Sequence, residues 1–432
     1  MSMRTIRGFL AIIVASVVAC VWASGAETGL SAEAKADFEW FSGLGFPDVK
    51  NLKFVEYYAG GAFQSPDSAG EETVVYGFLI SRNGNTNAVL DSSLTQLAFT
   101  NFPARAPRNE VSIYGTVTNR YTNYYHPSVL RNVDLRKPVR EFLDEQSKLP
   151  TNVENYTAIN RFRNRFPGFG NDVRATFFVL AWDCWQQGLV EEAQQIYAIA
   201  DRIPGLPRNE DGARPFRERL EKDFGKLATW RATVKFSDTN VSRADLLSEF
   251  QMVERRYPNS DYHKSAHDTV ERLTKMIEED RQHAAAAVKP LEQLSMDERV
   301  KELIFRLRDQ NGRQESQPGH CDIFYVIDRG VWNTNTPAHE LVKIGFPAVP
   351  HLIASLDNSN YSRSVGFWRE GTFSHTVLTV GDCAAQILNQ IAGKAFYQPK
   401  STSSYLSKDG DVVQVRRDAE AWWNEVNGKG QK

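Results

Sequence analysis

The chain has 432 residues, 41% of them hydrophobic and 24% charged, with a formal net charge of −2. This length is sufficient for two or three domains with sizeable cores, and the composition is that of a soluble globular protein. The nearly neutral charge argues against a broad nucleic-acid-binding surface, and no apolar run beyond the N-terminus is long enough to span a bilayer.

Residues 1–26 have the pattern of an export signal. Arg4 and Arg7 precede an apolar run, Phe9–Trp22, and the small residues Ala23–Ala26 follow it. We therefore expect residues 1–26 to be a signal peptide, and the mature protein to lie in the periplasm or cell envelope.

The cysteines leave two questions open. Val17-Val18-Ala19-Cys20 resembles a bacterial lipobox, so lipidation of Cys20 is the alternative to ordinary secretion and the only membrane attachment that we expect. In an exported chain two of the remaining cysteines, Cys184, Cys321 and Cys383, can pair, which leaves one buried thiol.

Residues 31–135 predict a small α+β module. The segment Ser31–Leu44 indicates a helix capped by its serine, and Phe54–Asn101 is rich in residues typical of antiparallel strands. Arg82–Asn85 predicts a turn between two of these strands. The tyrosine-rich segment Asn101–Pro127 favours ordinary packing, with the stacking of sugars or bases as the alternative.

Residues 136–288 predict a helical region that contains a paired-helix motif. Along Val173–Pro204 large residues face small ones, which lets two helices approach closely where they cross at Ala181, and Gly188 lies in the turn between them. The pattern resembles a tetratricopeptide (TPR) repeat, and it is carried by Phe177, Leu180, Ala181, Ala193, Tyr197 and Ala200.

Two further segments extend this motif, and the first, Tyr156–Phe169, has the pattern of the second helix of an earlier unit that is stopped by Pro167. Leu246–Met276 resembles the helical repeats of outer-membrane assembly and cell-division accessory proteins, through Phe250, Tyr257, Pro258, Ser260 and Tyr262. Before it, Pro207–Ala232 is charged and irregular, which predicts a long loop with one short helix.

A linker at His283–Pro290 precedes a C-terminal domain over residues 291–428. Ser295 and Glu298 form a capping box for an amphipathic helix, which we expect to end at Gly312. At the other end of the domain, Ala419, Trp422 and Val426 form an apolar stripe suited to capping the end of a helical stack.

The segment Pro337–Gly393 predicts three short helices, each with one apolar stripe. The first ends at Gly345, the second runs from Val349 to Leu356, and the third ends at Gly393. The run from Ala348 to Leu356, followed by Ala384–Leu388, resembles about one and a half HEAT repeats. The resemblance implies stacked antiparallel helices and is nearly silent on function.

One set of residues in this domain has the types needed for chemistry. His320, Cys321, His375 and Cys383 suit a cysteine–histidine nucleophile pair or a metal site, although the chain has no recognisable motif for metal, phosphate or nucleophilic catalysis. A structural role is favoured instead: a disulfide between Cys321 and Cys383, or two buried thiols. We expect no metal and no cofactor.

The segment Asn358–Thr376 interrupts the HEAT-like pattern. It holds residue types that are enriched at binding hot spots, namely Arg363, Phe367, Trp368, Arg369 and Phe373. These residues either bind a partner or fold back to fill the stack where a repeat is missing.

The sequence therefore predicts a mainly α protein with a small N-terminal α+β module, a TPR-like middle and a HEAT-like C-terminal domain. From these resemblances we expect an exported, non-enzymatic interaction protein of a bacterial cell envelope that binds a protein or peptide and no nucleic acid. A hydrolase-like or metal-binding activity and glycan binding are the alternatives.

Overall fold

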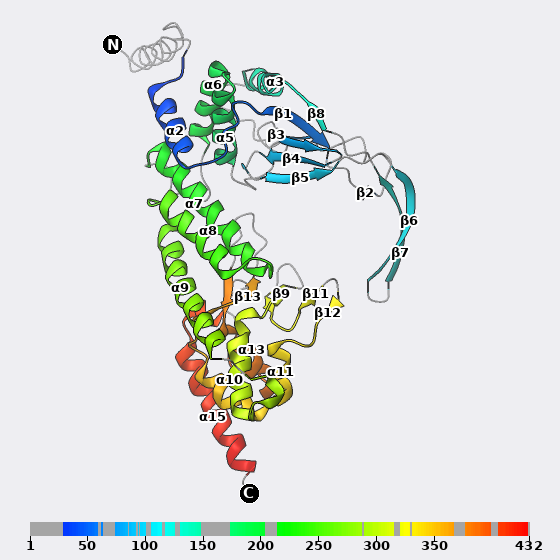
Figure 1. The fold of residues 1–432 in the computed structure, drawn as a ribbon, viewed down its shortest axis with the longest axis vertical. Helices are drawn as coiled ribbons and strands as arrows, with labels where there is room; N and C mark the ends of the chain where they lie inside the picture. The colour runs from blue at the N-terminus through cyan, green and yellow to red at the C-terminus, as the bar shows by residue number, and fades with distance from the viewer. Residues whose placement is uncertain are drawn as a thin grey trace, which may run out of the picture. The chain divides into compact units, whose positions relative to one another are not determined.

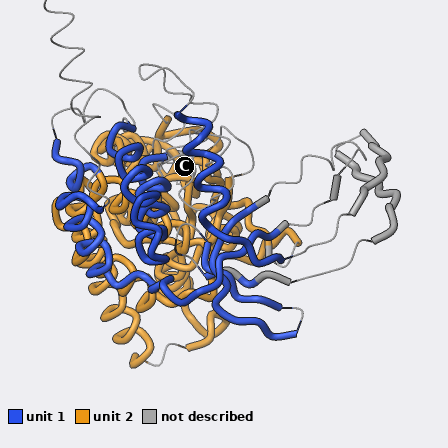
Figure 2. Tube along the Cα trace, turned by 90° about the horizontal axis from the view of Figure 1, so that it is seen from above, with its two compact units in different colours: residues 1–219 blue, residues 220–432 orange. Residues whose placement is uncertain are grey.

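The computed structural model describes residues 29–58, 62–63, 74–84, 86–91, 94, 96–100, 105–114, 117–125, 130–147, 173–203, 214–286, 289–314, 320–328, 331–366, 376–398 and 405–430. The chain divides into two compact units, residues 1–219 and residues 220–432 (Figure 2). The predicted domain boundaries near residues 135 and 288 lie inside these units. No helix in the described part of the chain has the length and apolarity to cross a membrane. The predicted signal peptide, Cys20 included, and the helix predicted for Tyr156–Phe169 lie outside the described residues.

Unit 1 contains the predicted antiparallel sheet (Figure 1). Its five strands lie in the order β5-β4-β3-β1-β8. The predicted turn joins β3 to β4, where Asn83 pairs with Thr86 and Gly84 has a φ of +59°. A second sheet has the order β2-β7-β6. The strands are β1 Lys53–Tyr58, β2 Ala62–Phe63, β3 Val74–Asn83, β4 Thr86–Asp91, β5 Gln96–Thr100, β6 Arg105–Tyr114, β7 Val117–Tyr125 and β8 Leu130–Asn132.

The described helices of unit 1 are α2 Ala32–Gly43, α3 Arg136–Ser147, α5 Val173–Gln186 and α6 Val190–Arg202. Ser31 caps α2 as predicted, because its hydroxyl accepts a hydrogen bond from the Ala34 amide at 3.2 Å. Phe38 and Phe41 of α2 lie against Phe178 of α5, with ring centroids 5.7 and 5.3 Å apart. An aromatic core therefore joins α2 to α5.

The predicted helix pair of residues 173–204 is present as α5 and α6. Its six motif residues are all buried, and Gly188 makes the turn with a φ of +77°. The pairing of two helices is thus confirmed, while the assignment to the TPR family remains a prediction.

Unit 2 begins within α7, Phe216–Val234, and continues into the helix pair α8, Arg243–Arg256, and α9, His263–Ala285. The expectation of a long loop with one short helix over residues 207–232 was wrong, because α7 has 19 residues. The interleaved charges had hidden an apolar stripe, Leu220, Phe224 and Leu227, whose spacing is helical and whose members are buried.

The remaining helices of unit 2 follow the predicted pattern closely. Ser295 and Glu298 form the capping box of α10, and Gly393 ends α13 in the left-handed conformation with a φ of +65°. The described helices are α10 Met296–Arg306, α11 Pro337–Ile344, α12 Val349–Ala354, α13 Val380–Ala392, α14 Leu406–Asp409 and α15 Val412–Gly430.

The helix α10 ends at Arg306 rather than at Gly312, and a short 3-10 turn, Leu307–Asp309, follows it. Gly312 instead allows a close backbone approach, because a Cβ atom there would lie 2.4 Å from the Cα of Ile323. The approach brings together β9, Arg313–Gln314, and β10, Cys321–Asp322.

Two further antiparallel hairpins belong to unit 2. One pairs β11, Ile327–Asp328, with β12, Val331–Trp332, and the other pairs β13, Tyr361–Gly366, with β14, Thr376–Thr379. The segment that interrupts the HEAT-like pattern therefore begins and ends as paired strands. In the predicted cap of the stack, Ala419 of α15 is buried and Trp422 packs against the core of unit 2. The mainly helical fold with a small N-terminal antiparallel sheet agrees with the sequence prediction.

Candidate functional site

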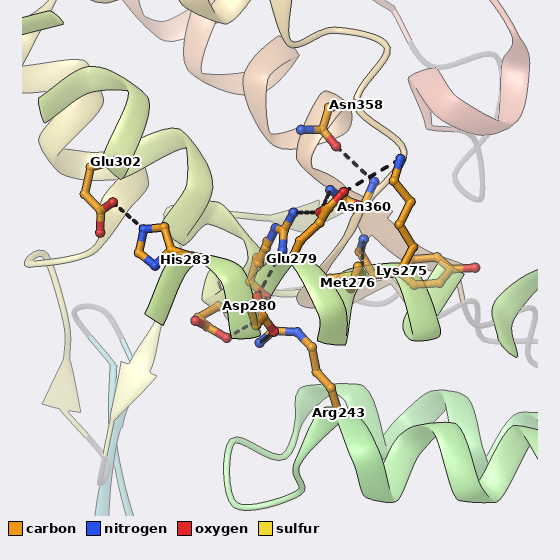
Figure 3. A network of polar contacts seen from close by, with 12 residues as sticks. Arg243, Lys275, Met276, Glu279, Asp280, His283, Glu302, Asn358 and Asn360 are labelled. Carbon is orange, nitrogen blue, oxygen red and sulfur yellow. Dashed lines mark hydrogen bonds and ion pairs between the residues drawn. The ribbon is translucent and has the colours of Figure 1, made fainter. Parts of the chain in front are cut away.

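A network of hydrogen bonds and ion pairs connects α9 to the C-terminal part of unit 2 (Figure 3). Arg308 is only 6% exposed, and its guanidinium donates to Glu279 and, at 3.0 Å, to Asp280. Arg243 of α8 reaches Asp280 at 2.9 Å, and the Asn360 amide donates to Glu279 at 3.1 Å. Cations and carboxylates are paired with each other, as burial of charge requires. Each of the charged side chains named here has a partner of opposite sign, so we regard this network as a structural connection.

A second pair of contacts extends the network toward α10. Nε2 of His283 lies 2.7 Å from a carboxylate oxygen of Glu302, and Arg306 donates to the other oxygen at 2.6 Å. Burial acts to raise the pKa of Glu302, but the hydrogen bonds from His283 and Arg306 outweigh it, so that this pKa is lowered. Glu302 is therefore held as a carboxylate by its partners.

Arg363, one of the predicted binding residues, points into unit 2. Its side chain donates to the carbonyl oxygens of Val241 and Asp238, at 2.8 and 3.3 Å, and the residue is only 7% exposed. Burial, and then the charge of Arg243, lower the pKa of Arg363. Because these contacts occupy the guanidinium, we do not include Arg363 in a binding surface. Phe367, Trp368, Arg369 and Phe373 lie outside the described residues.

The cysteines predicted as weak catalytic candidates are buried free thiols. Cys321 is 1% exposed and Cys383 is fully buried, and no disulfide joins them. Burial raises the pKa of both thiols, and the nearby carboxylate of Asp382 adds to the effect at each. Both therefore remain protonated, whereas a nucleophile or metal ligand must be a thiolate.

The histidines of that set do not complete a site in the described structure. The His320 ring makes an edge contact with Tyr405, with centroids 5.6 Å apart, and burial lowers the pKa of His320. His375 lies outside the described residues. Among the residues that are described, no group of three or more metal-ligating side chains comes together.

An exposed aromatic hairpin lies elsewhere in unit 2. Val331 and Trp332 of β12 are 68% and 64% exposed. The Trp332 indole donates to the carbonyl oxygen of Phe324 at 3.2 Å, and its ring lies 6.2 Å from that of Tyr325. These two contacts orient an indole that remains open to solvent, with the exposed Val331 beside it in the chain. We call Phe324, Tyr325, Val331 and Trp332 the aromatic hairpin.

A groove of about 590 Å³ adjoins this hairpin through Phe324. Its other wall is one face of α13, where Gln386, Asn389 and Gln390 recur at helical spacing, and Lys394 lies just beyond the helix end. The lining is mainly polar: it holds amide groups, Lys394 and one carboxylate, that of Asp322, which accepts a hydrogen bond from the Phe324 amide at 2.8 Å. Such a surface can bind a ligand but has no evident group for catalysis.

Neither feature follows from the sequence patterns described above. The short run Val331-Trp332 was too brief to register as a strand, and the amides of α13 lie outside the apolar stripe on which the helix was predicted. The amides at positions 386, 389 and 390 could have been found by their spacing. No family model, no curated protein and no solved structure shows a significant match to this chain.

Proposed function

We propose that the protein is an exported, non-enzymatic interaction protein of a bacterial cell envelope, and that it binds a protein or peptide through unit 2. The observation that carries this proposal is the aromatic hairpin. An indole that is 64% exposed yet held by a hydrogen bond to Phe324 presents a rigid apolar anchor, which is the type of residue that dominates binding energies.

The state of the cysteines supports binding over catalysis. A hydrolase that used Cys321 or Cys383 would need a thiolate in an open cleft, and both side chains are buried with raised pKa values. The TPR-like and HEAT-like character of the helix pairs adds support by analogy only, since such folds serve many partners. Export rests on the N-terminal pattern of residues 1–26.

Site-specific photo-crosslinking in cells tests this proposal. A photoreactive amino acid replaces Val331 in the full-length chain, and the matched control replaces Val413 of α15, which is 71% exposed and also apolar. We expect the variant at residue 331 to crosslink to one envelope protein that the control does not capture. That partner is then produced separately, and Trp332→Ala should weaken its binding at least tenfold.

Three outcomes would overturn the proposal. They are the absence of any crosslink at residue 331, the same products at residues 331 and 413, and retention of an intact Met1 on cytoplasmic protein. Binding of soluble oligosaccharides that is abolished by Trp332→Ala would point to the glycan alternative instead.

A further inference from the structure

The groove beside the aromatic hairpin already contains one example of backbone recognition. The Gln386 carboxamide accepts a hydrogen bond from the Ile323 amide at 3.2 Å and donates to the Cys321 carbonyl oxygen at 3.2 Å. A single glutamine of α13 thus binds both polar groups of an extended segment of the same chain. This works because a carboxamide presents a donor and an acceptor side by side, as an extended main chain does.

The same chemistry recurs along this face of α13. Asn389 accepts a hydrogen bond from the Phe396 amide at 2.9 Å through its oxygen. Gln390 lies one helical turn beyond Gln386, lines the groove and is exposed. Within the described structure no group bonds to the Gln390 carboxamide or to the Asn389 side-chain nitrogen. The groove therefore offers two donors and one acceptor that resemble the Gln386 arrangement but have no partner.

Two charged side chains, Asp322 and Lys394, line the groove, and the Asp322 carboxylate already accepts a hydrogen bond from the Phe324 amide at 2.8 Å. Lys394 is exposed, and its ammonium group lies 4.8 Å from the centre of the Phe396 ring. No carboxylate among the described residues lies within ion-pair distance of it. An acidic side chain, or a C-terminal carboxylate, would complement this cation.

We propose that the groove between α13 and Phe324 binds an extended peptide that carries a carboxylate. The peptide main chain bonds to the free amides of Asn389 and Gln390, its carboxylate pairs with Lys394, and an apolar side chain covers Phe324. This inference rests on the proposed function and adds the class of ligand and the residues that select it. Main-chain recognition supplies affinity in such complexes, and the flanking side chains supply specificity.

A peptide array tests the proposal with a defined probe. The array holds N-acetylated eight-residue peptides in which every position is varied through all amino acids, and the full mature chain is applied in solution. We expect the bound peptides to share an Asp or Glu at one position, or a free C-terminal carboxylate, and an apolar residue at another. Methylation of single backbone nitrogens should abolish binding at one or two positions, because it removes a main-chain donor.

Variants then locate the site. Gln390→Leu should weaken the best peptide about tenfold, and Lys394→Met should weaken it about tenfold at low salt with a smaller effect at high salt. The matched control is Gln414→Leu on α15, an exposed glutamine that bonds to Asp418 within its own helix, and it should bind as the parent does.

The possible results separate this inference from the proposed function. Peptide binding that ignores Gln390→Leu and Lys394→Met overturns the groove as its site, while crosslinking at Val331 still supports an interaction protein. Selected peptides without a shared carboxylate overturn the assigned ligand class. The absence of any peptide binding overturns the inference, and if crosslinking at Val331 also fails, the proposed function falls with it.

Discussion

The helix pairs α5–α6 and α8–α9 share one local design but lie in different surroundings. The 14-residue α5 is buried from Arg174 to Cys184, and aromatic rings surround it. The 23-residue α9 buries only Ala266, Thr269, Leu273 and Met276, and its other faces carry charges. A motif of large and small residues at the helix crossing thus defines how two helices meet, but it does not define what covers their outer faces.

The difference determines how each pair is stabilised. Burial of the α5 side chains depends on close packing, which tolerates little change in volume. The attachment of α9 depends on paired charges, above all those of Arg308 with Glu279 and Asp280. Volume changes should therefore damage α5–α6 most, and loss of charge should damage the attachment of α9.

The largest loss of stability is expected from Ala193→Trp, at the crossing of α5 and α6. Ala193 is fully buried, so an indole there must force the two helices apart, at a cost of about 3 kcal/mol. Urea unfolding measures the loss, and hydrogen exchange of residues 173–203 assigns it to the helix pair. Ala198→Trp is the control, because Ala198 is exposed on the same helix, and it should unfold as the parent does. Equal stability of the two variants would refute the packing described for this pair.

Loss of the buried Arg308 cation in unit 2 should cause the next largest loss of stability. Arg308→Met removes the cation that Glu279 and Asp280 share and leaves them their contacts with Asn360 and Arg243, at a cost of about 2 kcal/mol. The control Arg281→Met removes an exposed arginine that pairs with Glu278 on the same helix, and it should change stability little. Faster hydrogen exchange in α9 of the first variant alone would support the network, and equal behaviour of the two would contradict it.

Sequence patterns predicted the elements of this fold well where apolar spacing and caps coincide. Ser31, the capping box at Ser295 and Glu298, and the end of α13 at Gly393 are examples. The patterns failed for α7, because its charges outnumber the residues of its apolar stripe. They also could not reveal that Arg363 is buried, since that depends on carbonyl groups more than 120 residues away in the chain, on Val241 and Asp238. The exposed Trp332 was missed for a related reason, because exposure is a property of the folded surface.

A third prediction concerns the one buried acid of α5 whose carboxyl Oδ1 has no hydrogen-bond partner. Burial raises the pKa of Asp183 well above its usual value, so the folded state binds a proton more tightly than the unfolded state does. The contribution of this carboxyl to stability should therefore be greatest below the unfolded pKa of about 4 and should fall as the pH rises toward the folded pKa. Asp183→Asn cannot ionise, so it should remove this dependence and stabilise unit 1 by about 1–2 kcal/mol at pH 8.

Urea titrations at pH 4 and pH 8 measure the change, with hydrogen exchange of α5 as the local probe. The control is Asp144→Asn in α3, an acid that is not buried. If Asp183→Asn raises the free energy of unfolding equally at pH 4 and pH 8, ionisation of this carboxyl does not limit the stability of unit 1.

The smallest loss of stability is expected from substitutions in the turns of the two helix pairs, which differ in backbone conformation. Gly188 joins α5 to α6 with a φ of +77°, and a Cβ atom there would meet nothing within 4 Å, so any cost of substitution comes from the backbone alone. Gly188→Ala should therefore destabilise unit 1 by about 1 kcal/mol, and Gly188→Asn by a few tenths, because asparagine tolerates the left-handed conformation better. The turn between α8 and α9 contains no residue with positive φ, and there Asn259→Ala probes side-chain contacts with Glu221 instead. If Gly188→Ala and Gly188→Asn cost the same in urea unfolding, the strain assigned to this turn is absent.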